Sequence, residues 1–219
     1  MSAINSPEAL LLTSTHCQHC HTLELLLHKR LADGRLKGLD VINIEQSPEL
    51  VKQHNARSVP WLQLGTCIFD EALTPGELDH WIALITDNQA RSPYLEYLLS
   101  NGKLDWVLEW FEHDKACLND LIAILIKDDV KMNVRIGISA VMERYEDTDA
   151  IRKVVPELAK LIQHEDPVIR MDACHYLTLT RSDGITGPIN NLLNDEDRQV
   201  RQIAQECLEE IVEMQNTRA

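Results

Sequence analysis

The stretch Ala9-Leu-Leu-Leu-Thr-Ser-Thr-His-Cys17-Gln-His-Cys20 decides how the N-terminal part of this chain folds. Its apolar run is too short for a helix, so we expect a buried strand over residues 9–13. Leucines then recur at helical spacing at positions 23, 26, 27 and 31, and Asp33-Gly34 ends the predicted helix. The two cysteines therefore lie where a strand passes into a helix.

The pattern continues to alternate between strand and helix as far as residue 86. The predicted elements are a β-branched strand over 39–44, a short helix from Ser47-Pro48 to about His54, two strands over 61–64 and 66–69 around Gly65, and a helix opened by the capping box Thr74–Glu77. The expected order is β-α-β-α-β-β-α. This order predicts an α/β domain in which helices pack on a mixed sheet.

From residue 92 onward the strand patterns end and every apolar pattern has a helical period. Three segments align, with a shared arginine at 135, 170 and 201, and each follows an apolar helix. The repeats cover about 118–145, 154–180 and 187–214. A repeated helix pair at this period predicts a stacked helical solenoid. We expect the repeated arginines to be structural, with Arg170 and Arg201 paired to Asp166 and Asp197, four residues before them.

Charge and composition exclude several classes of function. Acidic residues number 35 against 21 Lys and Arg, a net charge of −14, which divides as −5 over residues 1–90 and −9 over residues 91–219. That excess would repel a phosphate backbone or an anionic lipid surface, so we expect neither nucleic acid nor membrane as a partner. Apolar runs are too short to span a bilayer, and no basic region precedes the first of them, so we expect a cytoplasmic protein.

Six cysteines do not indicate a disulfide framework in a cytoplasmic protein, because thiols stay reduced there. Cys17 and Cys20 differ from the others in position: the positive end of a helix and its unpaired backbone N–H groups favour a thiolate. Such a pair can close into a disulfide and reopen, with Cys17 as the attacking thiol and Cys20 as the resolving one. The remaining four are predicted to be small core residues: Cys67, Cys117, Cys174 and Cys207.

Residues 8–86 resemble the thioredoxin family, in a trimmed form without the leading strand and helix. The resemblance rests on the Cys17-x-x-Cys20 pair in its strand-to-helix setting and on Val59-Pro60, which directly precedes a strand. It implies that Pro60 is a cis-proline packed against the cysteine pair and that Val59 offers its backbone to an extended substrate segment. We therefore expect a thioredoxin-like domain over residues 1–88.

Three positions depart from the thioredoxin pattern. His16 stands where thioredoxins usually carry Trp, Leu11 falls near the position of the buried acid that assists proton transfer, and Gln18-His19 replaces Gly-Pro. Because His19 can stabilise the Cys17 thiolate, we expect a reduction potential above the roughly −270 mV of thioredoxin. The predicted catalytic residues are Cys17, Cys20, His19 and Pro60, and the predicted substrate-binding residues are His16, Val59 and Trp61.

The helical segments resemble HEAT-like repeats of the short kind with an Asp-x-x-Val-Arg-x-x-Ala signature. The copies that begin at Asp166 and Asp197 match well, whereas the first has Lys131 and Ile138 at two signature positions. The resemblance implies a HEAT-like repeat domain over residues 89–219. Such repeats are protein-binding scaffolds of varied use, so they predict fold better than chemistry.

Metal binding is the competing interpretation of the cysteine motif. His16, Cys17, His19, Cys20 and His21 place five nitrogen or sulfur donors within six residues, a set that suits zinc, copper or a shared iron–sulfur cluster. At the start of a helix these side chains point in several directions, which disfavours a closed site within one chain. The redox interpretation is therefore preferred, with no metal and no cofactor.

The sequence predicts a thiol–disulfide oxidoreductase whose helical repeats hold a protein substrate or partner. Recycling then needs a thiol reductant, either a thioredoxin reductase or the glutathione system. An alternative makes the chain an adaptor or holdase, in which the repeats bind proteins and the cysteine pair only regulates them.

Overall fold

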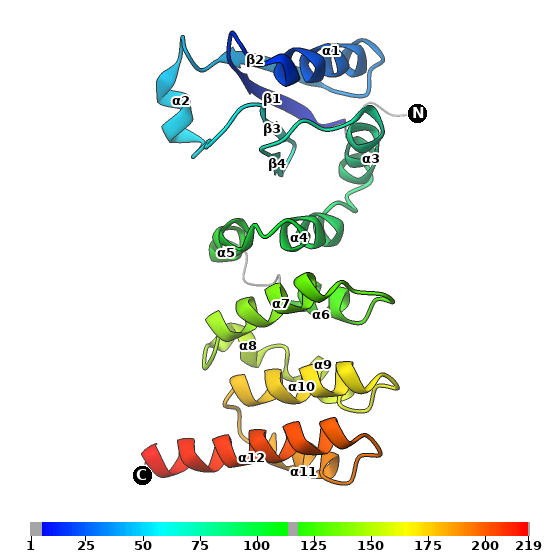
Figure 1. Cartoon of the computed structure of the whole chain (residues 1–219), viewed down its shortest axis with the longest axis vertical. Coiled ribbons are helices and arrows are strands. Elements are labelled where there is room, and N and C mark those ends of the chain that lie inside the picture. Colours follow the sequence, from blue (N-terminus) through cyan, green and yellow to red (C-terminus); the bar gives the residue numbers. More distant parts are fainter. Residues whose placement is uncertain (1–5, 114–117, 219) are drawn as a thin grey trace. The chain divides into compact units, whose positions relative to one another are not determined.

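The computed structural model describes residues 6–113 and 118–218, and the chain divides into two compact units, Met1–Tyr94 and Leu95–Ala219. The first unit contains a mixed four-stranded sheet, and the described part of the second is helical (Figure 1). The predicted change from a mixed α/β sequence to a helical one is confirmed at this level. No helix within the described ranges is long and apolar enough to cross a bilayer.

The elements of the first unit follow the predicted order. They are β1 (Glu8–Thr13), α1 (Gln18–Ala32), β2 (Gly38–Asn43), α2 (Pro48–Gln53), β3 (Trp61–Leu64), β4 (Cys67–Phe69) and α3 (Pro75–Thr86). In the sheet the strand order is β2-β1-β3-β4. Strand β1 runs parallel to β2 and antiparallel to β3, and β3 and β4 are antiparallel. Central strand β1 therefore leads directly into the helix that carries the cysteine pair.

One face of this sheet forms the core of the first unit. The register places Leu11 opposite both Val41 and Leu62, so alternate residues of neighbouring strands share a face. Helices α1 and α3 cover it: α1 contacts β1 and β2, and the ring of Trp81 in α3 lies 5.3 Å from that of Phe69. Arg30 of α1 also binds Asp79 of α3 with 2.7 and 3.0 Å hydrogen bonds. Six side chains of this face are no more than 4% exposed: Ala9, Leu11, Leu62, Leu64, Cys67 and Phe69.

The opposite face of the sheet is only partly covered. Trp61 is buried there, with its ring 5.0 Å from that of His54, the residue after α2. Further along the same face, Asp40 is exposed and Gln63 half-buried, and both line a shallow hollow together with Glu8. The sequence predicted a buried strand at β2, but β2 lies at the edge of the sheet, and its described residues are half-buried or exposed.

The described part of the second unit is a succession of helices. Helix α4 (Arg91–Ser100) crosses the division, and it is followed by α5 (Leu104–His113), α6 (Leu118–Leu125), α7 (Met132–Arg144), α8 (Asp149–Arg152), α9 (Val155–Leu161), α10 (Pro167–Leu179), α11 (Thr186–Leu192) and α12 (Arg198–Arg218). Each predicted repeat contains one helix pair: α6 with α7, α9 with α10, and α11 with α12.

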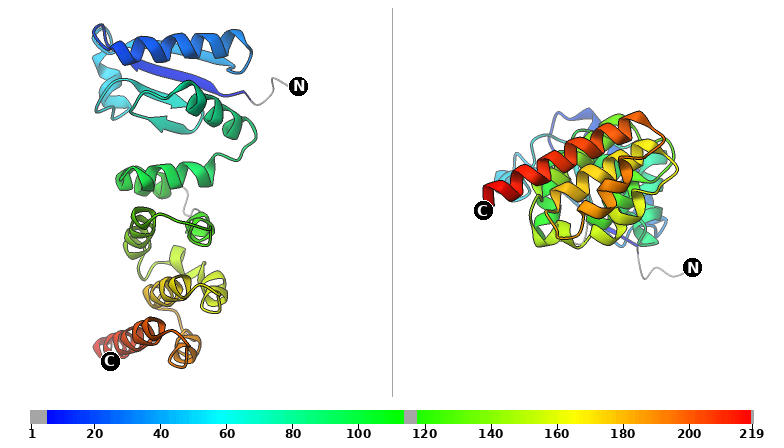
Figure 2. Two further views of the ribbon diagram at one scale, coloured as in Figure 1. Left: turned by 45° about the vertical axis from the view of Figure 1, so that its right-hand side comes forward. Right: turned by 90° about the horizontal axis from the view of Figure 1, so that it is seen from below.

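The second helices of these pairs, α7, α10 and α12, stack in sequence order (Figures 1 and 2). Arg135 of α7 binds Asp172 of α10, and one turn later Ser139 meets the hydroxyl of Tyr176, so the two helices run parallel. Arg170 binds Asp195, which precedes α12.

The repeated arginines are structural, as predicted, but their predicted partners were wrong. Asp166 and Asp197 accept hydrogen bonds from the backbone N–H groups of Val168 and Gln199, at the starts of α10 and α12. Because these aspartates bind the backbone of their own helices as N-caps, Arg170 and Arg201 donate their hydrogen bonds to other acceptors. Arg201 donates to the carbonyl oxygens of Asp195 and Glu196.

Candidate functional site

Cys17 and Cys20 form a disulfide, with an S–S distance of 2.05 Å and Cα atoms 5.2 Å apart. Cys17 is the N-cap of α1, and Cys20 lies in its first turn. The sulfur of Cys17 accepts a hydrogen bond from the backbone N–H of Cys20 at 3.1 Å. Cys20 is fully buried, whereas Cys17 is only half-buried. Of the two sulfurs, that of Cys17 is the one an outside reactant can reach.

The start of α1 suits a thiolate at Cys17 once the disulfide is reduced. The first turn of the helix carries no acidic residue that would oppose the positive end of the helix dipole. An N–H group already points at the Cys17 sulfur, and such hydrogen bonds favour the charged form of an acceptor. Three exposed imidazoles lie close to the pair along the chain: His16 before it, His19 between the two cysteines, and His21 after it.

A cluster of hydrogen bonds holds the loop that precedes Cys17. Glu45, just beyond β2, accepts from the backbone N–H of Thr15 at 3.1 Å and from its hydroxyl at 2.6 Å. The side-chain amide of Asn43 donates to the same hydroxyl at 3.0 Å, and its oxygen accepts from the N–H of Glu45. The two bonds from Thr15, together with the positive charge available at His16, hold the pKa of Glu45 below its usual range.

Sequence reasoning missed this cluster, although a signal for it existed. Thr13 pairs with Asn43 at the carboxyl ends of the parallel strands β1 and β2. Residues that follow adjacent parallel strands meet at one edge of a sheet, where sites commonly form. Thr15 and Glu45 each lie two residues beyond these paired ends. Their contact could therefore have been predicted from the strand order.

Val59 and Pro60 lie at the same end of the sheet as the cysteines. Trp61 pairs with Leu12 of β1, so Pro60 lies level with the end of β1 from which the chain continues to Cys17. The Val59–Pro60 bond is cis, as the resemblance implied. Pro60 is buried and Val59 half-buried. Trp61 is 1% exposed and offers almost no surface to a substrate. The substrate-binding roles of Trp61, His16 and Val59 stay predictions.

Three of the four cysteines predicted to be core residues are buried free thiols: Cys67, Cys174 and Cys207. The fourth, Cys117, lies outside the described residues. Burial raises the pKa of the Cys67 thiol to about 12, which keeps it protonated and unreactive at neutral pH. No three His, Cys, Asp or Glu side chains in the described ranges lie together as a metal site would need.

Comparison with known proteins gives no further guide to this site. No family model matches the chain, and no curated protein is similar to it in sequence.

Proposed function

We propose that this chain is a thiol–disulfide oxidoreductase that acts on protein substrates through Cys17 and Cys20. One observation carries the proposal: a disulfide at the first turn of a helix joins an accessible N-cap sulfur to a fully buried one. This asymmetry is what dithiol exchange requires, because one thiol must attack the substrate while the second stays close enough to resolve the mixed disulfide. The mixed sheet, with the cysteine pair where its inner strand β1 leads into α1, supports assignment to a thioredoxin-like fold.

In the reductive direction, the Cys17 thiolate attacks a disulfide of the substrate. A mixed disulfide forms and one substrate thiolate leaves. Cys20 then loses its proton and attacks the Cys17 sulfur, which releases the second substrate thiol and leaves the Cys17–Cys20 disulfide. A thiol reductant of the cell must supply two electrons and two protons to restore the pair. His19 is proposed to stabilise the Cys17 thiolate, and His16 and Val59 to contact the substrate.

The helical unit is proposed to be a HEAT-like platform that holds the protein substrate. Its helix pairs stack in order, which is the arrangement of repeat proteins with extended binding surfaces. Met132 and Ile136 lie one turn apart on α7 and are 71% and 62% exposed. Adjacent exposed apolar side chains form a small patch of the kind that marks binding surfaces, so these two residues are the first candidates for substrate contact.

Reduction of insulin by the reduced full-length chain tests the proposal. We expect turnover with the unmodified chain and none with Cys17→Ser, because the attacking sulfur is gone. Cys20→Ser should instead accumulate mixed disulfides with protein substrates, since the resolving thiol is gone. Cys67→Ser is the matched control and should keep full activity, because that buried thiol takes no part. Equal rates for Cys17→Ser and the unmodified chain would overturn the proposal.

The adaptor alternative draws on the same exposed residues of α7. If the repeats alone act, the double variant Cys17→Ser/Cys20→Ser should prevent aggregation of an unfolded client protein as well as the unmodified chain does. Met132→Glu/Ile136→Glu should then abolish that protection. The metal alternative is tested by the metal content of protein purified without a His-tag.

A further inference from the structure

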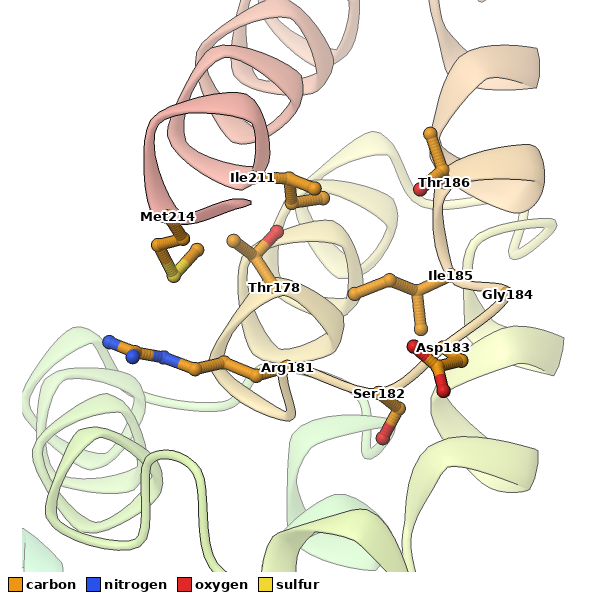
Figure 3. A pocket seen from close by; sticks show the side chains of 9 residues that line it. All are labelled: Thr178, Arg181, Ser182, Asp183, Gly184, Ile185, Thr186, Ile211 and Met214. Carbon is orange, nitrogen blue, oxygen red and sulfur yellow. The ribbon is translucent and has the colours of Figure 1, made fainter. Parts of the chain in front are cut away.

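A second pair of thiols lies in the helical unit, far along the chain from the first. Cys174 of α10 and Cys207 of α12 are 0% and 4% exposed, and their side chains are hydrogen-bonded to each other. One turn beyond each cysteine, Thr178 and Ile211 lie beside one another between the same helices (Figure 3). The two thiols therefore belong to one layer of the α10–α12 contact, in direct reach of each other.

A groove in the surface of this helix contact reaches the pair from the side of Cys207. The groove, of about 380 Å³, runs between α10 and α12, and Cys207 is part of its lining while Cys174 is not. The lining residues are Met171, Asp172, His175, Ile203, Glu206, Cys207 and Glu210. A small molecule in this groove would therefore meet the sulfur of Cys207 first, with Cys174 behind it.

The two thiols also differ in their readiness to ionise. The hydrogen bond from Cys174 lowers the pKa of the Cys207 thiol, against the opposing effects of burial and of Glu206 and Glu210. That shared hydrogen bond, together with burial, raises the pKa of Cys174. The outer sulfur is therefore the more easily ionised of the two, as the attacking thiol of an exchange must be.

We propose that Cys174 and Cys207 are a second thiol–disulfide couple, in which Cys207 reacts first with small cationic or uncharged disulfides that enter the groove. The Cys207 thiolate attacks one sulfur of the small disulfide, a mixed disulfide forms, and one small thiolate leaves. Cys174 gives up its proton and attacks the Cys207 sulfur, so the second small thiolate leaves. Two protein thiols become one disulfide, and one small disulfide becomes two thiols.

The charges around the groove select the oxidant. Glu206 and Glu210 face Cys207 from α12, and Asp172 and His175 face it from α10. The charge of Asp172 is offset by Arg135, to which it is bound, and His175 lies 3.7 Å from Glu143. The two glutamates leave the groove negative, which repels anionic disulfides such as oxidised glutathione and attracts cationic ones such as cystamine.

Peptide mapping of the full-length chain tests the proposal. Folded protein is treated with cystamine, then digested at acidic pH without reductant and examined by mass spectrometry. We expect a peptide that contains Cys174 linked to one that contains Cys207. The same link should form on the order of tenfold more slowly with oxidised glutathione at low salt, and the two rates should converge at high salt. Glu206→Gln/Glu210→Gln should remove the preference for cystamine.

Two further variants, each with Cys17→Ser, Cys20→Ser and Cys117→Ser, define the order of the steps. With Cys174→Ala, cystamine should leave a stable adduct on Cys207. With Cys207→Ala, Cys174 should stay unmodified, because it does not line the groove. The proposal is overturned if the Cys174–Cys207 link forms only in denaturant, or if Cys174 takes the adduct as readily as Cys207. The mapping of the unmodified chain needs no variant to fold, and it is independent of the role proposed for Cys17 and Cys20.

Discussion

Glu45 holds Thr15 by two hydrogen bonds, one to each carboxylate oxygen, in the loop that leads to Cys17. The hydroxyl of Thr15 donates to Glu45 and accepts from Asn43, so its hydrogen-bonding capacity is used on both sides. Two residues further along, the N–H of Cys17 bonds to the carbonyl of Ser14 at 3.2 Å. The orientation of Cys17 at the start of α1 therefore depends on a loop that is fixed from β2.

Thr15→Val removes the hydroxyl and keeps the shape of the side chain. We expect insulin reduction to slow several-fold, while the stability of the exposed loop changes by less than about 1 kcal/mol. Because the effect acts through Cys17, the pH profile of Cys17 alkylation should shift as well, which a merely structural role would not cause. Thr22→Val is the control, since the exposed Thr22 hydroxyl bonds only to the carbonyl of Gln18 on its own helix. A Thr15→Val variant with unchanged rate and unchanged alkylation profile would contradict this role.

The same loop should respond to acid. The bonds from Thr15 favour the ionised carboxylate, so the pKa of Glu45 is lowered in the folded chain. The two hydrogen bonds between Glu45 and Thr15 therefore persist at every pH above the Glu pKa of the unfolded chain, about 4.3. They are lost only as the pH falls through the lower pKa of Glu45 in the folded chain. The amide proton of Thr15, followed by NMR, should titrate with a midpoint below about 4.3. In Glu45→Gln that titration should be absent.

The buried ion pair of Arg170 and Asp195 should dominate the electrostatic stability of the helical unit. Its two hydrogen bonds measure 2.8 and 2.7 Å, and the side chains are 7% and 10% exposed. Arg170→Ala leaves a buried carboxylate unpaired, at a cost of about 3 kcal/mol. Lys160→Ala removes the exposed pair with Glu157 and should cost less than about 1 kcal/mol. If Arg170→Ala and Lys160→Ala lower the urea midpoint for unfolding of the helical unit equally, this ranking is refuted.

Acid should weaken the same pair in a defined window. The hydrogen bond from Arg170 lowers the pKa of Asp195 in the folded chain. Its contribution is therefore complete above the unfolded Asp pKa of about 3.9 and disappears as the pH falls through the lower folded value. The raised pKa of Arg170 has no effect near neutrality, since arginine stays charged there in both states. Urea midpoints of Asp195→Asn should depend less on pH in this range than those of the unmodified chain.

How far the sequence could predict these features depends on whether the cause is local. The capping box at Thr74 and Glu77 and the Gly34 that ends α1 with a φ of +72° were predictable, because neighbouring residues create them. The order of strands and helices along the first unit was equally clear from alternating patterns. The partner of Arg170 was not, because Asp195 lies 25 residues away and the nearer Asp166 serves its own helix. The Cys174–Cys207 contact was missed for the same reason, since neither helix alone brings the thiols together.

The reduction potential of the Cys17–Cys20 pair tests the role of His19. An exposed imidazole in the first turn of α1 can stabilise the Cys17 thiolate, and a more stable reduced state raises the potential. We expect the unmodified chain to lie above about −270 mV in equilibrium with glutathione, and His19→Gln to lie lower. His21→Gln, also exposed in this turn, is the control and should shift the potential less. A value of about −270 mV or below for the unmodified chain excludes the role.

Selective alkylation of the reduced chain tests the asymmetry of the two cysteines. At neutral pH, iodoacetamide should label Cys17 at least about tenfold faster than Cys20, because only Cys17 combines exposure with the positive end of α1. Cys67 should stay unlabelled, since burial raises the pKa of its thiol to about 12. In urea the differences should vanish, which shows that they arise from the fold. If Cys20 reacts as fast as Cys17 in the folded chain, the assignment of attacking and resolving thiols is wrong.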